Sequence, residues 1–138
     1  MSEKTETRNN EQTEEYWFVD IDGYEENDRS FSILAAGCLC SKCRKKLKAD
    51  TGEVPVEKLI EAVRSCCSKQ ADYITSEMPV LESVFRIILA NGNKPLKTED
   101  LAARLMERRG SIPGGGSGNV LLRLLKNDGF YGINSRPE

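Results

Sequence analysis

The apolar residues of this 138-residue chain alternate with polar ones near the start and adopt helical spacing further on. Two segments show period-two alternation, residues 16 to 22 (YWFVDID) and residues 31 to 35 (FSILA). Such alternation predicts short strands. The intervening GYEENDR contains Gly, Asn and Asp, which favour turns. We therefore expect an N-terminal β-hairpin.

Beyond residue 55 the apolar positions recur every three or four residues, which predicts helices. Pro55 stands at a favourable first helical position, and the apolar stripe after it predicts a helix with Cys66 and Cys67 at its end. A second stripe begins after Pro79 and stops at Asn91-Gly92, a good left-handed cap. This part of the chain is expected to be helical.

The last third continues the helical pattern. Thr98 offers an N-cap for a third helix, whose basic end suits the helix dipole. The segment SIPGGGSG predicts a linker, followed by a short helix and a strand over residues 130 to 133. The fold class expected is α+β, mainly α.

Length and composition limit the organisation of the chain. With 138 residues and 38% hydrophobic content, it has enough apolar surface for one modest core or two very small ones. Residues 1 to 15 contain no apolar residue after Met1, so we expect a disordered tail. We expect one unit over residues 16 to 78, with the hairpin, the cysteines and a helix, and then a helical domain over residues 79 to 138.

Charge is distributed unevenly. Residues 1 to 28 carry two basic and ten acidic groups, 2 - 10 = -8, whereas residues 29 to 79 and 80 to 138 each carry nine and six, 9 - 6 = +3. Either the acidic tail is a solubilising extension, or it folds back and competes with an acidic ligand for the basic body.

The expected compartment bears on the five cysteines. No apolar run is long enough to span a bilayer, and the polar, acidic start does not resemble a signal peptide. We expect a cytoplasmic protein, or one at the nucleoid or nucleus if it binds DNA, with no membrane partner. In a reducing compartment an odd number of cysteines favours metal binding over disulfides.

Cys40 and Cys43 form a Cys-x-x-Cys turn, which can place two sulfurs on one zinc ion. Our first choice of metal ligands is Cys40, Cys43, Cys66 and Cys67. Adjacent helical side chains point apart, so Cys66 and Cys67 can both bind only if their helix ends there. Cys38 is the alternative to one of them. Neighbouring lysine and arginine side chains would favour the thiolates.

Residues 31 to 70 resemble the treble-clef and zinc-ribbon proteins, in which a knuckle and a helix-borne half-site share one zinc. The adjacent Cys-Cys differs from the second Cys-x-x-Cys of those families. The lack of histidine favours a closed structural zinc over a catalytic one. Iron–sulfur or thiol redox chemistry, and cysteines that merely pack in the core, are the alternatives.

Residues 79 to 133 resemble a winged-helix domain of the HARE-HTH type, in the runs LESVFRIILANGNKPLKTEDLAARLMERRG and VLLRLLKNDGFYGI. The resemblance implies DNA or chromatin association. In that docking mode Arg123 and Lys126 would lie on the groove-entering helix, and Arg108 and Arg109 would contact phosphates. Only NSRPE follows Ile133, which is too short for the second strand of the wing.

We therefore expect a zinc-binding regulatory module associated with double-stranded DNA and transcription. The alternative is a protein-interaction adaptor with a structural zinc and no bound nucleic acid. The chain contains no histidine, and no serine or cysteine with an evident base, so we do not expect an enzyme. The partner and the oligomeric state stay open.

Overall fold

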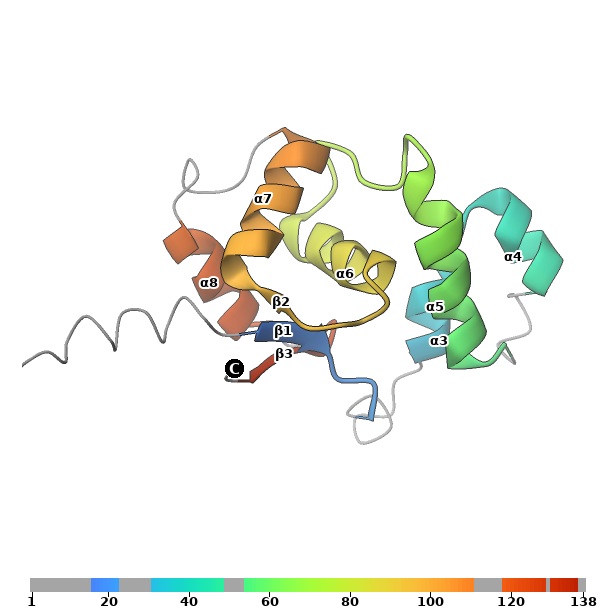
Figure 1. Cartoon of the computed structure of the whole chain (residues 1–138), viewed down its shortest axis with the longest axis horizontal. Coiled ribbons are helices and arrows are strands. Elements are labelled where there is room, and N and C mark those ends of the chain that lie inside the picture. The colour runs from blue at the N-terminus through green and yellow to red at the C-terminus, as the bar shows by residue number, and fades with distance from the viewer. Residues whose placement is uncertain (1–15, 23–30, 49–53, 111–117, 129, 137–138) are drawn as a thin grey trace, which may run out of the picture.

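In the computed structural model, the described residues are 16–22, 31–48, 54–110, 118–128 and 130–136 (Figure 1). The expected tail and most of the linker lie outside them. No helix among these residues is long and apolar enough to cross a membrane. In chain order the elements are β1 (Tyr16–Val19), α3 (Phe31–Ala36), α4 (Ser41–Leu47), α5 (Val56–Ser65), η2 (Cys67–Lys69), α6 (Val80–Ala90), β2 (Leu96–Lys97), α7 (Thr98–Arg109), α8 (Gly118–Lys126) and β3 (Ile133–Arg136).

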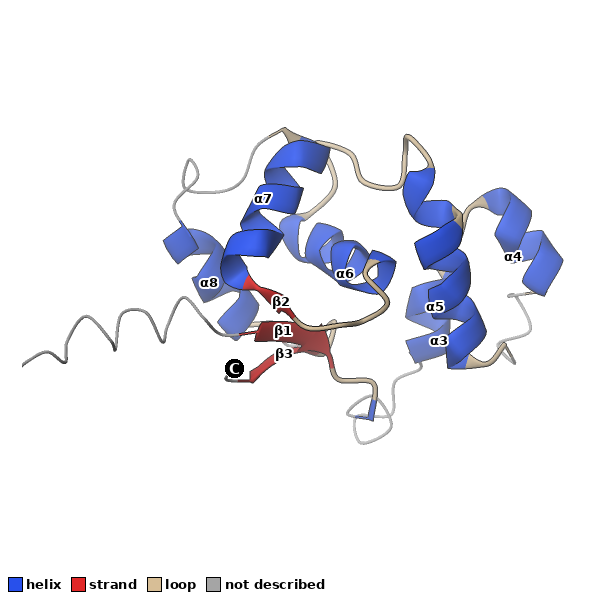
Figure 2. Cartoon of the chain, in the orientation of Figure 1, coloured by secondary structure: helices blue, strands red, loops and turns tan. Residues whose placement is uncertain are grey.

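The fold is mainly helical with one small antiparallel sheet (Figure 2). The strand order is β2-β1-β3, so β1 is central and pairs with two strands from the second half of the chain. Trp17 and Val19 are both buried on one face, as their period-two spacing predicts. The indole Nε1 of Trp17 donates a 2.8 Å hydrogen bond to Oγ1 of Thr98.

The predicted N-terminal hairpin is wrong, because residues 31 to 36 form helix α3. Phe31 and Ala35 are buried whereas Ile33 is exposed, a pattern of i and i+4 spacing that belongs to a helix. The ring of Phe31 packs edge-on against Phe85 of α6, 6.2 Å between centroids. This contact with α6 and the two alanines favour the helix over the apparent alternation.

Two predicted boundaries also need correction. The last strand begins at Ile133 rather than at residue 130, because the Asp128 carboxylate accepts hydrogen bonds from the N–H groups of Phe130, Tyr131 and Ile133. Those bonds hold the preceding residues in a turn. Helix α7 has Lys97 as its N-cap, since the Thr98 side chain is buried against Trp17.

Helix α6 runs through the middle of the molecule (Figure 1) and packs against α5, α7 and β1. Its buried residues belong to a single core cluster that includes members from α3 to β3. The chain leaves α6 through Gly92 at φ 74°, a left-handed conformation that suits glycine, as the Asn91-Gly92 pair predicts. The two units expected from the sequence therefore share one core and one sheet.

Replacing Thr98 with valine keeps the shape of the side chain and leaves the buried N–H of Trp17 without an acceptor. We expect the free energy of unfolding to fall by about 1–3 kcal/mol, measured by urea denaturation. In the double variant with Trp17→Phe, the loss should be smaller than the sum of the two single losses. Strict additivity would show that the two side chains are not coupled.

Candidate metal centre

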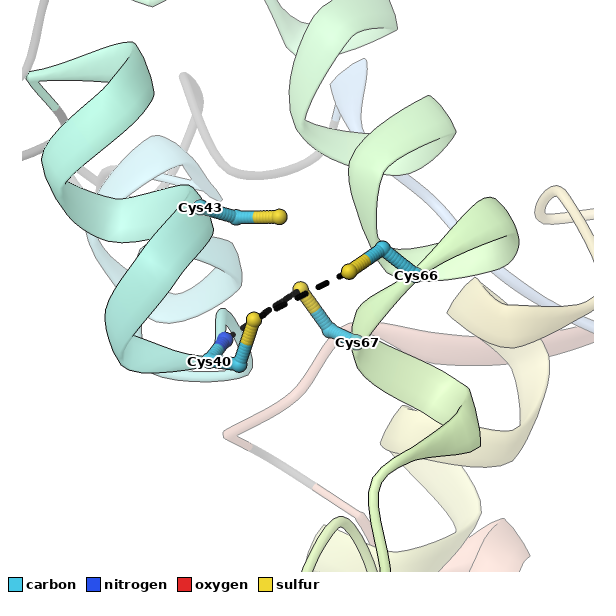
Figure 3. Close-up of side chains that lie close together, drawn as sticks. All are labelled: Cys40, Cys43, Cys66 and Cys67. Carbon is cyan, nitrogen blue, oxygen red and sulfur yellow. Dashed lines mark hydrogen bonds between the residues drawn. The ribbon is translucent and has the colours of Figure 1, made fainter.

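Four cysteine side chains converge between α4 and the end of α5 (Figure 3). Their Sγ atoms all lie within 4.8 Å of one another. They are the four residues chosen from the sequence: Cys40, Cys43, Cys66 and Cys67. Cys43 and Cys67 are buried, and the other two are half-buried. The cluster thus joins two segments that are separated by more than one full helix along the chain.

The first half-site is formed at the start of α4. Cys40 has extended backbone angles (φ -73°, ψ 166°) and is the N-cap residue, while Cys43 lies in the first turn. The Cys40 carbonyl accepts from the N–H of Arg44 at 2.9 Å, which closes that turn. The Cys-x-x-Cys spacing therefore places both thiols on the side of α4 that faces α5 (Figure 3).

The second half-site depends on the end of α5. The helix stops at Ser65, and Cys66 adopts non-helical angles (φ -134°, ψ -61°) before the 3-10 turn that starts at Cys67. In a continuous α-helix, adjacent side chains would point about 100° apart. The break at Cys66 allows both thiols to point toward Cys40 (Figure 3), as the sequence required for joint ligation.

The sulfur spacing fits a single metal ion. The Sγ atom of Cys40 lies 4.0 Å from that of Cys66 and 3.6 Å from that of Cys67. Sulfurs bound tetrahedrally at about 2.3 Å from zinc lie about 3.8 Å apart. A disulfide would need about 2.05 Å, and all five cysteines are free thiols. The donor set and its spacing therefore match one tetrahedral ion.

The surrounding hydrogen bonds favour one thiolate in particular. The backbone N–H of Cys43 hydrogen-bonds to Sγ of Cys40 and, with help from nearby thiols, lowers the pKa of Cys40 to about 7. Burial raises the pKa of Cys43 to about 12 and raises that of Cys67. The N–H of Cys40 donates to Sγ of Cys67 at 3.2 Å. A bound divalent cation would stabilise the remaining thiolates and release their protons.

Cys38 lies outside the four-sulfur group. It is buried, and its thiol donates to the carbonyl of Leu34 at 3.8 Å, one turn earlier in the chain. Burial raises the pKa of this thiol to about 12. Cys38 therefore behaves as an apolar core residue.

Helix α6 fastens both halves of the centre. The Arg86 guanidinium donates to the carbonyls of Gly37 (3.1 Å) and Tyr73 (2.9 Å), which flank the cysteines on the two segments. The Tyr73 hydroxyl donates to the Arg86 carbonyl at 2.6 Å. Both side chains line a cavity of about 520 Å³ beside the cysteines. These contacts had no signal in the sequence, because they join residues far apart in it.

The arginines predicted as phosphate contacts at the end of α7 make contacts within the protein. Arg108 donates to the Ser68 carbonyl at 3.0 Å, and its guanidinium lies 5.6 Å from the centre of the Tyr73 ring. Arg109 donates to the carbonyls of Ser76 and Met78. The two arginines thus hold η2 and the segment between η2 and α6 against α7. A nucleic-acid role for them stays a prediction.

The two basic residues predicted on α8, Arg123 and Lys126, are exposed. Helix α8 and helix α4 lie at opposite ends of the molecule (Figure 1). The structure thus places the two predicted contacts on α8 far from the cysteine centre, whereas Arg108 lies beside it.

Comparison with known proteins gives no matching family model, no matching curated protein and no matching solved structure. The chemistry of the centre is therefore argued from its own geometry.

Two buried cysteines provide a matched test of this geometry. We expect Cys43→Ala to abolish stoichiometric zinc or cobalt binding, because it removes one of four ligands, and Cys38→Ala to keep it. Titration with Co²⁺, followed by the thiolate charge-transfer absorption, checks both variants. Loss of metal binding in a folded Cys38→Ala protein would contradict the assignment.

Proposed function

We propose that Cys40, Cys43, Cys66 and Cys67 bind one structural zinc ion. The observation that carries the proposal is that the four sulfurs lie within 4.8 Å of one another. The Sγ atom of Cys40 lies 3.6 Å from that of Cys67 and 4.0 Å from that of Cys66. Four thiolates fill a tetrahedral site and leave no position for a substrate, so the zinc would act on folding. It would clamp α4 to the end of α5.

The sulfur spacing supports a single ion over an iron–sulfur cluster. In a cluster the cysteines bind different irons, which requires sulfurs farther apart than those around one ion. Among the divalent ions available to a tetrahedral four-thiolate site, zinc is the common structural choice. Iron–sulfur chemistry would be recognised by visible absorption of the purified protein.

We further propose that the chain is a DNA-associated regulatory module. The helices α6, α7 and α8, followed by β3, correspond to the three helices and the strand after them in the winged-helix resemblance. β1 pairs with β3 across residues 16 to 19 and so supplies a second strand beside the one that follows α8. Arg123 and Lys126 are exposed on α8, the helix that would approach DNA in this docking mode.

A protein-interaction adaptor is the second candidate. Three large apolar side chains are exposed among the described residues: Ile33 at 67%, Phe130 at 50% and Met106 at 44%. Phe130 packs edge-on against Tyr131, 4.9 Å between ring centroids, and Tyr131 and Ile33 line the same cavity of about 270 Å³. Exposed apolar groups of this kind occur in protein interfaces. This candidate would share the zinc site and bind no nucleic acid.

Elemental analysis tests the zinc proposal directly. We expect about one zinc per chain in protein purified without chelators. All five thiols should then react slowly with a thiol reagent, because four are metal-bound and Cys38 is buried, and a chelator should make the four bound thiols reactive. Protein without metal, whose half-buried Cys40 and Cys66 react at once, would contradict the proposal.

Titration with mixed-sequence duplex DNA at several salt concentrations tests the second proposal. We expect binding that weakens as salt rises, and the double variant Arg123→Gln, Lys126→Gln should lower the slope by about 2, because each lost phosphate contact removes about 0.9. A control that removes the same charge is Lys58→Gln, Lys69→Gln, at exposed positions on α5 and η2. No binding by the natural chain at low salt would leave the adaptor ahead.

A further inference from the structure

Helix α4 and the residue after it carry a dense group of positive charges beside the cysteine centre. No acidic residue occurs from Arg29 to Ala49. The cations of this group, which we call the α4 basic group, are Lys42, Arg44, Lys45, Lys46 and Lys48. The four lysines are exposed, and Arg44 is half-buried.

Balancing the thiolates does not account for all of these charges. One divalent ion with four thiolates carries 2 - 4 = -2, and the three exposed lysines of α4 alone bring the local sum to -2 + 3 = +1. The metal centre thus leaves α4 positively charged. Excess charge on exposed side chains attracts anionic partners from a distance.

The three exposed lysines of the helix lie on one face. Lys42, Lys45 and Lys46 are related by steps of three and four residues, which align side chains along an α-helix. Cys43, the buried residue of α4, lies on another face and points toward α5 (Figure 3). The lysine face therefore points away from the centre that holds the helix.

The metal ligands are the main attachment of α4. Only Cys43 is buried within the helix, and Leu47 is half-buried. The helix lies at one end of the molecule, next to α5 (Figure 1). Because Cys40 and Cys43 meet the sulfurs at the end of α5, a metal ion there would fix the position of the whole basic face.

We infer that the lysine face of α4 binds nucleic-acid phosphates, and that the metal centre holds this face in place. The inference rests on the proposed zinc and on the proposed DNA association, and adds a second contact surface remote from α8. Nucleic acid is favoured over an acidic protein, because no exposed position of α4 carries an apolar or aromatic side chain, whereas protein interfaces depend on such anchors. Exposed lysines on one helix face suit phosphate contacts without base readout.

The first experiment uses the metal-bound protein. We expect Lys45→Gln, Lys46→Gln to weaken binding to mixed-sequence duplex DNA and to lower the salt slope by about 2, while metal content stays unchanged. The control Lys58→Gln, Lys69→Gln removes the same charge from α5 and η2 and should leave the slope unchanged.

The outcomes separate this inference from the proposal on which it rests. An unchanged slope in the α4 variant, together with a lowered slope in the α8 variant, overturns the α4 surface alone. No binding by the natural chain overturns the DNA association and the α4 surface together. Equal effects in the α4 variant and its control also overturn the inference, since the charge would then act without regard to position.

The dependence on the metal has its own measurement. We expect chelation to increase amide hydrogen exchange in residues 41 to 47 strongly, whereas α6 and α7 keep their protection. Unchanged protection of α4, or loss of protection through the whole chain, would overturn the idea that the metal holds this helix in particular.

Discussion

The early end of helix α5 is the constraint on which the cysteine centre depends. A regular helix through Cys67 would turn one of the two adjacent thiols away, and three sulfurs would then face one another. The departure of Cys66 from helical angles brings both into the group with Cys40 and Cys43. The same break starts the turn that contains Ser68, whose carbonyl accepts a hydrogen bond from the guanidinium of Arg108 on α7. One local change of backbone direction thus shapes both the centre and its link to the helical body.

Helix α6 connects the cysteine centre to the rest of the fold. It is buried on most sides, and its one central cation, Arg86, binds carbonyls on both cysteine-bearing segments. An arginine in such a place can satisfy several carbonyls at once because its donors spread in a plane. The cysteine centre is therefore a part of the main core. Its position does not depend on sulfur chemistry alone.

Some of this could be predicted from local pattern. The helices after residue 55 could be predicted from the sequence, because their apolar stripes are long and their ends carry Pro55, Pro79 and Gly92. The Cys40 and Cys43 spacing predicted one half-site, and the expected end of a helix at Cys66 and Cys67 predicted the other, with Cys38 as the alternative to one of them. Pattern alone failed where distant residues decide: six residues from Phe31 suit a strand or a helix equally, and packing against Phe85 selects the helix. The strands that flank β1 come from residues about 80 and 115 positions later, beyond the reach of local propensity.

The central place of β1 also affects how the chain acquires its shape. Asp20 and Asn134 are hydrogen-bonded although 114 positions separate them, and β3 beside them is synthesised after every other described element. Closing such a large loop is slow compared with forming the helices between. During synthesis one edge of β1 therefore stays unpaired until β2 (Leu96–Lys97) has emerged, and the other until β3 (Ile133–Arg136) has emerged. Unpaired edges invite strands from other molecules. The interval before β3 arrives is thus when the nascent chain is most exposed to aggregation, and when a chaperone would have most to protect.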